Sequence, residues 1–298
     1  MMMTPVRTRA CLRYAILLVL IAGAACDSPS EPKTRNSGFD IEVRYFEPLT
    51  PLQTAAFQAA AARWQSVITG DLPDVNITTG TGVTANRCNI RHPAFTGLID
   101  DLLIFVDVDS IDGPNAQVGA GGPCFFRNGS RLTVIGVMKF DRADMQIMQA
   151  NGTLQNVILH EMGHVLGFSP DAWSELGLVA DPDSDDPIFT GANARNRFVL
   201  AGGTSPSGVP LENTGGAGTR GAHWRETVFG AELMTGFIST GLTPLSAITL
   251  GSLADIGYEV DYGAADTYSI PGMAALRVDE PAMRINEQII RPIGGIAP

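Results

Sequence analysis

Residues 153–168 read Thr-Leu-Gln-Asn-Val-Ile-Leu-His-Glu-Met-Gly-His-Val-Leu-Gly-Phe and contain the motif His160-Glu161-x-x-His164. Side chains four positions apart on a helix lie on one face, so His160 and His164 can point two imidazoles at a single ion. Glu161 lies beside the first histidine and stays free to take a proton from an attacking water. Two neutral imidazoles and such a carboxylate are the core of a zinc hydrolase site.

The flanking residues favour a helix around this motif. Asn151 or Thr153 can cap its start, and apolar residues then repeat at the spacing of a buried helix face. Gly167 can end the helix in the left-handed conformation. The alternative is an ordinary core helix, but two buried imidazoles without an ion would still need polar partners.

The composition limits the classes of protein to consider. The chain has 298 residues, 45% of them hydrophobic, so it is long and apolar enough for one large domain or two small ones. Its net charge of −11 argues against nucleic acid as a partner, because proteins that bind nucleic acid are usually basic.

The N-terminus has the features of an export signal over residues 1–25. Three arginines precede Tyr14–Ala22, an apolar run that is short for a membrane span. The segment leads to Cys26 in a form that resembles a bacterial lipoprotein signal, in which this cysteine carries the lipid. The alternative is ordinary signal cleavage after Ala24, which would release a soluble protein. Either form predicts export, and residues 26–38 have the composition of a flexible tether.

The cysteine content agrees with export to an oxidising compartment. Cys88 and Cys124 are the two cysteines outside the signal and its end, and we expect them to form a disulfide. In the chain-entropy model the loop it closes would stabilise the fold by about 3–4 kcal/mol. The alternative is a thiol that ligates and inhibits the metal, but no separate pro-segment is visible to carry it.

Hydrophobic periodicity outlines the other elements. We expect strands at 39–46, 75–78, 101–108, 115–120 and 131–140, and helices at 51–68, 193–200 and 243–256. Residues 83–97 look irregular, and we expect His92 within them to be exposed to solvent and outside the metal site. Residues 169–222 lose periodicity, and a loop this long in a compact domain is usually functional.

Two acidic runs match calcium loops only in part. Asp107, Asp109 and Asp112 follow a buried strand, but Ile111 stands where the third loop oxygen should lie, and the terminal glutamate is missing. Calcium at this loop is a secondary hypothesis. The run at 181–185 lacks the loop glycine and the bidentate residue, so we exclude an EF-hand there.

A catalytic zinc usually has three protein ligands, so the motif needs a third. Gly167 lets the chain turn back after the helix, but Pro170 follows where a ligand could stand, and proline cannot ligate. His223 is the best-placed candidate among the other histidines, and Met234 follows it. The alternative for His223 is a histidine on a surface loop.

With these residues, the sequence resembles the leishmanolysin family of metzincin zinc peptidases. The likeness lies in 160–168, 223–236 and 253–258; the family also has an insertion before its third histidine and a methionine turn after it. The resemblance implies three zinc ligands, a general base and an apolar floor under the metal, namely His160, His164, His223, Glu161 and Met234. The chain departs from the eukaryotic members in having few cysteines and no recognisable pro-domain.

The resemblance also implies an α+β fold. We expect a twisted mixed sheet of about five strands, the active-site helix, a second C-terminal helix below the cleft, and a long loop insertion before the third ligand. The catalytic domain is expected to span 39–262, and a tail without strong period, which could pack as an extended segment, covers 263–298.

The predicted function is that of a zinc-dependent endopeptidase acting on extracytoplasmic proteins or peptides. By the element order of metzincins, the substrate would extend along the edge strand at 115–120. Contact with a membrane would be through the N-terminal lipid only. Two alternatives stay open: a non-catalytic surface lipoprotein that keeps the fold for adhesion, and a zinc hydrolase that acts on a non-peptide bond.

Overall fold

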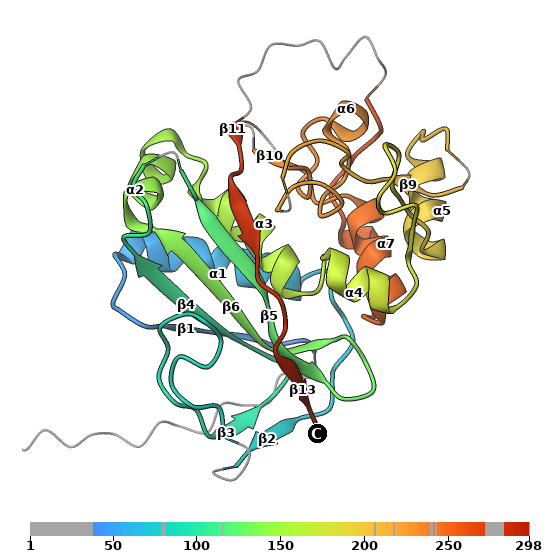
Figure 1. The fold of residues 1–298 in the computed structure, drawn as a ribbon. Helices are drawn as coiled ribbons and strands as arrows, with labels where there is room; N and C mark the ends of the chain where they lie inside the picture. The colour runs from blue at the N-terminus through green and yellow to red at the C-terminus, as the bar shows by residue number, and fades with distance from the viewer. Residues whose placement is uncertain are drawn as a thin grey trace, which may run out of the picture. The chain divides into compact units, whose positions relative to one another are not determined.

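A mixed sheet of six strands forms the base of the fold (Figure 1). Its order is β1-β4-β6-β5-β12, and β13 also pairs with β5. Strands β1, β4 and β6 are parallel, β5 runs antiparallel to β6, and β12 and β13 run parallel to β5. The strands span Ile41–Tyr45 (β1), Leu102–Asp109 (β4), Gly119–Arg127 (β5), Thr133–Asp141 (β6), Glu287–Ile289 (β12) and Gly294–Ile296 (β13).

The computed structural model describes residues 38–78, 82–114, 116–205, 207–216, 218–238, 241, 243–271 and 283–297. These residues belong to one compact unit that starts at Asn36. The predicted export signal, Cys26 and nearly all of the tether at 26–38 lie outside the described residues. None of the described helices is long and apolar enough to cross a membrane.

Strand β4 is buried on both faces, which explains its nearly continuous apolar sequence. Its even-numbered residues pack in the main core with helices α1 (Pro51–Gln65) and α3 (Leu154–Val165). On the other face, Leu103 and Phe105 pack in a second core that contains the disulfide Cys88–Cys124. The predicted disulfide is therefore confirmed.

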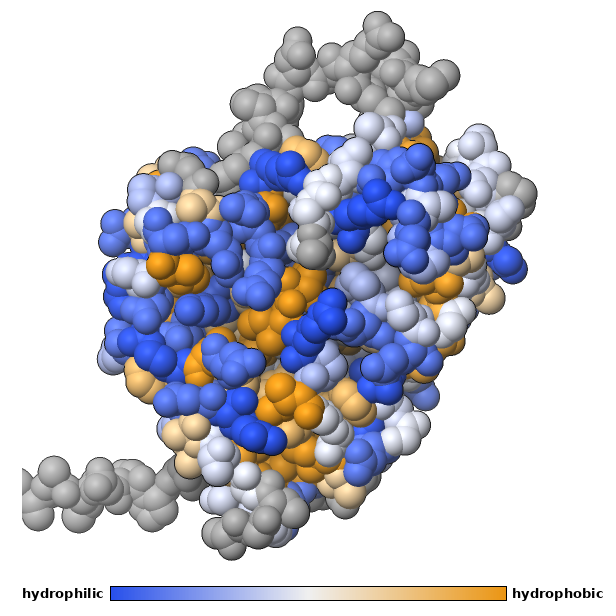
Figure 2. Space-filling model, in the orientation of Figure 1, coloured by the Kyte–Doolittle hydropathy of each residue, from blue (hydrophilic) through white to orange (hydrophobic). Residues whose placement is uncertain are grey.

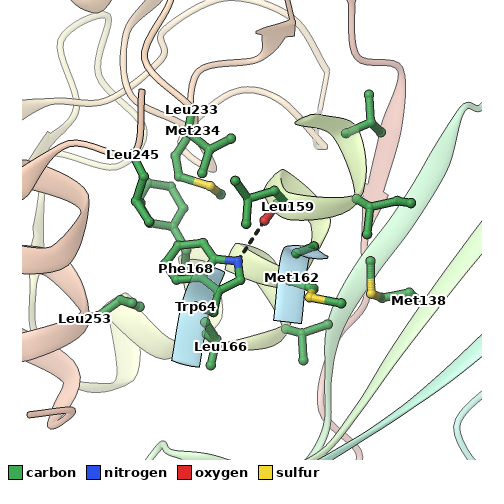
Figure 3. Packing of buried hydrophobic residues seen from close by; sticks show 14 of the residues in the cluster. Trp64, Met138, Leu159, Met162, Leu166, Phe168, Leu233, Met234, Leu245 and Leu253 are labelled. Atoms are coloured by element: carbon green, nitrogen blue, oxygen red, sulfur yellow. Dashed lines mark hydrogen bonds between the residues drawn. The ribbon is translucent and has the colours of Figure 1, made fainter. Parts of the chain in front are cut away.

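Helix α1 begins where the sequence predicts. The Thr50 hydroxyl accepts a hydrogen bond from the Gln53 N–H, and the Gln53 side chain accepts one from the Thr50 N–H, which forms a capping box. Near the other end, the buried indole of Trp64 donates to the carbonyl oxygen of Leu159 over 2.9 Å (Figure 3). This bond joins α1 to the helix that carries the motif.

An unpredicted helix, α2 (Arg142–Asn151), leads into α3, and the Asp141 side chain caps its start. Of the two predicted caps, Thr153 is the N-cap residue of α3, but its hydroxyl donates to the Asn151 side chain and makes no cap bond. The Asn151 side chain accepts from the N–H of Thr153, before the helix begins. Gly167 follows α3 with a φ of 105°, which confirms the predicted left-handed end.

The long segment after α3 contains more regular structure than its composition indicates. The helix expected at 193–200 is present as α5, and a short helix and a three-stranded sheet accompany it. These elements are α4 (Pro170–Glu175), β7 (Val179–Ala180), β8 (Ile188–Phe189), α5 (Ala192–Leu200) and β9 (Val209–Pro210).

Helix α7 spans Ala247–Ile256 and begins later than the Thr243-Pro244 start that the sequence predicts. Ser246 is its cap and accepts from the N–H of Thr249. The buried carboxylate of Glu232 accepts hydrogen bonds from the N–H and hydroxyl of Ser246, and these hold the residue before the helix in an extended conformation.

Strand β5 begins at Gly119, later than the predicted strand at 115–120, and Asn115 lies outside the described residues. The prediction of an edge strand is wrong, because β5 pairs with β6 on one side and with β12 and β13 on the other. The other short elements are β2 (Val75–Ile77), β3 (Gly97–Ile99), α6 (Glu226–Phe229), β10 (Phe237–Ile238), a 3-10 turn (Tyr262–Ala264) and β11 (Met283–Arg284). The predicted α+β class with a mixed sheet agrees with the structure. The sheet exceeds the expected five strands because the tail adds β12 and β13 along β5.

Candidate metal centre

Three histidines converge on one point in the interior of the protein. His160 and His164 come from successive turns of α3, and His223 comes from the loop between β9 and α6. The Nε2 atoms of His160 and His164 lie 3.0 Å apart, and each lies 3.2 Å from Nε2 of His223. All three side chains are fully buried, so the structure brings together the three predicted ligands.

The second nitrogen of each ring fixes which atom carries the proton. Each Nδ1 bonds to a backbone carbonyl: that of Leu233 at 2.6 Å for His160, of Phe168 at 2.7 Å for His164, and of Thr219 at 3.2 Å for His223. A carbonyl oxygen only accepts hydrogen bonds, so each Nδ1 is the donor. Each Nε2 therefore presents a lone pair to the other two.

Three lone pairs that face one another this closely repel unless a cation lies among them. In a tetrahedral zinc site, metal–nitrogen bonds of about 2.0–2.1 Å hold the nitrogen ligands about 3.3 Å apart. The separations between the three Nε2 atoms are close to that value. Burial lowers the pKa of His164 to about 4, whereas for His160 burial is outweighed by the neighbouring charge of Glu287 and by hydrogen bonds, and the pKa is raised. A metal ligand must be a neutral imidazole, and the bonds of Nδ1 to backbone carbonyls leave Nε2 as the ligating atom in each ring. The donor set therefore fits a zinc ion.

Backbone and aromatic contacts hold the loop that carries His223. The carbonyl oxygen of His223 accepts from the N–H of Glu212 at 2.8 Å, and the N–H of Trp224 donates to the carbonyl of Met234 at 3.0 Å. The indole of Trp224 also donates to the hydroxyl of Thr249 in α7 at 2.8 Å. Because His223 is buried by these contacts, the surface-loop alternative is wrong.

Met234 packs against the middle of the motif. Figure 3 shows its side chain beside Leu233, next to the helix α3 that carries Leu159 and Met162. A Cβ atom at Gly163 would lie 2.6 Å from Sδ of Met234 and 3.3 Å from the ring of Trp64, so a larger residue there would force the buried Met234 side chain to move. Gly163 therefore has a packing role between the two motif histidines that the sequence alone did not reveal.

Glu161 lies against the glycines of β5. A Cβ at Gly119 would lie 3.1 Å from Oε1 of Glu161, and one at Gly121 would lie 2.7 Å from Oε2. Burial, followed by the neighbouring charge of Glu287, raises the pKa of Glu161 well above the ordinary value of a glutamate. A carboxyl group with a raised pKa can both accept a proton and release it.

Glu287 of β12 is a fourth group in the centre, and sequence reasoning missed it. Its Oε1 lies 2.7 Å from Nε2 of His223, and its Oε2 lies 3.2 Å from Nε2 of His160 and 3.5 Å from Nε2 of His164. Its carboxylate adds negative charge beside three lone pairs, which strengthens the case for a cation. The one signal in the sequence is that Glu287 is the only acidic residue within 283–297.

Glu232, also missed from the sequence, ties the segment after His223 to helix α7. Its buried carboxylate accepts from the N–H of Met234 at 2.6 Å and from the hydroxyls of Ser246 at 2.7 Å and Thr249 at 2.5 Å. Burial raises the pKa of Glu232, and these hydrogen bonds act in the opposite direction. The network fixes the residues beside Leu233, whose carbonyl orients His160.

His92 lies apart from the centre, as expected, but the prediction that it is exposed is wrong. Its ring is 1% exposed and stacks on Phe105 with 4.6 Å between ring centroids. Its Nδ1 bonds to the carbonyl of Pro93 at 2.7 Å. The sequence around His92, an irregular segment with a proline after the histidine, does not indicate that the ring stacks on Phe105.

The acidic residues of the calcium hypothesis have other partners. Arg91 forms ion pairs with Asp107 at 2.7 Å and with Asp109 at 3.4 Å. Asp112 accepts from the backbone N–H of Gln117 at 3.2 Å. In the part of the chain that the structure describes, these three carboxylates form no cluster of metal-ligating atoms.

A His-Glu-x-x-His helix beneath a mixed sheet, with a third imidazole from a distant loop, is the arrangement of a metallopeptidase. A family model described as leishmanolysin matches residues 73–275 of the chain. A leishmanolysin homolog from Crithidia fasciculata is 31% identical over 124 residues, which is 38% of this chain and 18% of that relative. The chain belongs to the leishmanolysin family, and its match spans under a fifth of that relative's length.

Proposed function

We propose that the protein is a zinc-dependent endopeptidase of metzincin type that hydrolyses peptide bonds of extracytoplasmic proteins. The observation that carries this proposal is the triangle of three Nε2 atoms beside a buried glutamate. In this proposal His160, His164 and His223 hold the zinc. The export signal predicted at 1–25 supports an extracytoplasmic place of action, and we propose Cys26 as the site of a lipid anchor.

The residues of the site divide the chemistry among them. When bound, zinc supplies Lewis-acid polarisation of the scissile carbonyl and makes water acidic enough to be deprotonated near neutral pH. Glu161 accepts the proton of the attacking water and passes it to the leaving amine. The carbonyls of Leu233, Phe168 and Thr219 keep the three rings oriented, and Met234 packs beneath them.

The side of strand β5 that β12 and β13 cover in this structure is the proposed docking edge for the substrate. An extended peptide can add to an exposed strand through main-chain hydrogen bonds, and pockets for side chains then give selectivity. Gly119 and Gly121 bring the backbone of β5 close to Glu161. A peptide paired with β5 would therefore pass next to the proton acceptor.

Zinc content tests the ligand set. The wild-type protein should bind one zinc per chain, and His223→Ala combined with Glu287→Gln should lose most of it, because only two imidazoles then remain as strong ligands. His223→Ala alone should bind zinc more weakly than the wild type. His92→Ala is the matched control, since His92 is also buried but lies outside the centre. Equal zinc content in the wild type and in the combined variant would overturn the proposal.

Glu161→Ala tests the reaction itself. This variant should keep its zinc and lose cleavage of casein or gelatin, and a chelator should abolish the cleavage by the parent protein. The non-catalytic adhesion alternative predicts no chelator-sensitive cleavage at all. A hydrolase of non-peptide bonds would spare casein and gelatin but act on ester or amide probes.

A further inference from the structure

We propose that residues 283–297 are a built-in inhibitor of the site: they occupy the docking edge of β5 and place the carboxylate of Glu287 in the metal centre. This inference rests on the proposed peptidase function, since it concerns the regulation of the same site. It is argued from the strand pairing, the course of the chain and the position of one side chain.

The tail takes the hydrogen bonds that a substrate would need. Along β5 and its flanks, main-chain bonds of 2.8–2.9 Å join Val118 to Asn286, Ile290 to Gly121, Ile293 to Cys124, and Asn128 to Ile296. Between these bonds β12 and β13 pair with β5 in parallel. Figure 1 shows the tail running along β5 as its outer neighbour. With the tail in place, β5 is no longer a free edge.

The other side of the tail is lined by the segment that carries the third histidine. The N–H of Ile285 donates to the carbonyl of Gly236 at 3.0 Å, and β11 pairs with β10. The carbonyl of Glu287 lies so close to Gly218 that a Cβ there would collide with it. The tail therefore passes between β5 and the His223 segment, and a peptide cannot reach Glu161 along this path unless the tail leaves.

The alternation of the strand points Glu287 inward. Ile285 and Glu287 are buried, whereas Asn286 and Gln288 are exposed, as expected for a strand with one covered face. Both oxygens of Glu287 face the three Nε2 atoms at 2.7–3.5 Å. Catalytic zinc sites keep one position open, whereas four protein donors close a site. Glu287 is therefore the group that closes this one.

The tail is held in a way that allows release. Its pairing with β5 is parallel, which is slightly less stable per residue than antiparallel pairing, and β12 and β13 are short. The side chain of Arg291, between the two strands, is 80% exposed, and its ion pair with Asp171 is long, at 3.5 Å. Figure 2 shows apolar residues gathered at the surface along the line that these strands follow in Figure 1.

The test uses the full chain loaded with cobalt, whose visible spectrum reports the number of ligands. Glu287→Gln removes the charged donor, and Glu287→Gln combined with Gln288→Glu keeps the net charge but moves the carboxylate to the exposed face. A third variant, Ile290→Pro, removes the N–H that donates to Gly121 and leaves the metal centre untouched. Each chain is titrated with acetohydroxamate, which binds open metal positions, and assayed on gelatin.

We expect Glu287→Gln and the double variant to bind acetohydroxamate at least ~10-fold more tightly than the wild type, to change the cobalt spectrum and to cleave gelatin at least ~10-fold faster. Ile290→Pro should change in the same direction by less. Cobalt uptake by all chains with unchanged spectra and hydroxamate affinity would overturn the inference and leave the peptidase proposal intact. Failure of every chain to bind cobalt would instead overturn the proposed metal site and the inference with it.

Discussion

Nδ1 of His160 lies 2.6 Å from the carbonyl oxygen of Leu233, the residue before Met234. This single hydrogen bond joins the helix that carries the motif to the segment that follows the third histidine. The orientation of one imidazole therefore depends on residues more than seventy positions away, and packing changes in that segment should reach the metal centre.

Gly163→Ala should damage both stability and zinc affinity. In an exposed helix this change stabilises by about 1 kcal/mol, but here the new methyl group collides with Met234, and overpacking costs about 1–3 kcal/mol. We expect a net loss in urea unfolding and weaker zinc binding. Gly216→Ala is the control, because no atom lies within 4 Å of its added methyl group. Equal effects of the two changes would contradict this account.

Glu232→Ala should lower the free energy of unfolding by about 2–4 kcal/mol, because several buried donors lose their acceptor. Chemical denaturation of the zinc-free protein measures the effect without the contribution of the metal. Glu259→Ala, at an exposed position, provides the comparison and should change stability little. A Glu232→Ala protein as stable as the Glu259→Ala protein would refute the bridging role of this carboxylate.

The raised pKa of Glu226 predicts that the stability of the protein falls as the pH rises from about 4.5 to 7. Burial raises its pKa from 4.5 to about 7, and the charge of Glu212 adds to the shift. The folded protein keeps a proton that the unfolded chain releases, so this stabilising contribution is complete below about pH 4.5 and is lost as the pH rises towards 7. In Glu226→Gln the fall in Tm across this range should be smaller than in the wild type. An identical fall in the two proteins would contradict the assignment.

Removal of the disulfide should cost about 3–4 kcal/mol in the chain-entropy model, since the bond closes a loop with a sequence separation of 36 residues. Cys88→Ser combined with Cys124→Ser, or reduction of the wild type, should lower the free energy of unfolding by this amount and lower the Tm accordingly. Because the pair lies in the second core, away from the histidines, zinc stoichiometry at low temperature should be unchanged. Loss of zinc in the double variant would show that the two cores are coupled.

The parts of the site that the sequence predicted share a strong local signal. The spacing of His160 and His164 sets a shared helix face, and Gly167 has the left-handed φ expected after a helix. His223 required an argument by elimination together with the family resemblance. The disulfide between Cys88 and Cys124 could be predicted because these are the only two cysteines outside the signal and its end.

The parts that the sequence did not predict depend on contacts between distant segments. Glu287 reaches the centre because β12 pairs with β5, and nothing local in a short tail strand specifies a partner so far back in the chain. Helix α7 begins after Ser246 and not at Thr243, because Glu232 binds Ser246 from another segment. The buried position of His92 likewise depends on Phe105, a partner in β4.

Gly119 and Gly121 leave the wall over Glu161 without side chains. At these two positions of β5 a polypeptide would meet backbone amide groups, which are the same for every amino acid, and no side chain of the strand. We therefore expect the proposed peptidase to recognise an extended backbone beside Glu161, independently of the side chains that the polypeptide carries. Preference for particular residues would then have to arise from contacts farther along β5. Unfolded or loosely folded proteins would be the preferred substrates of the proposed peptidase.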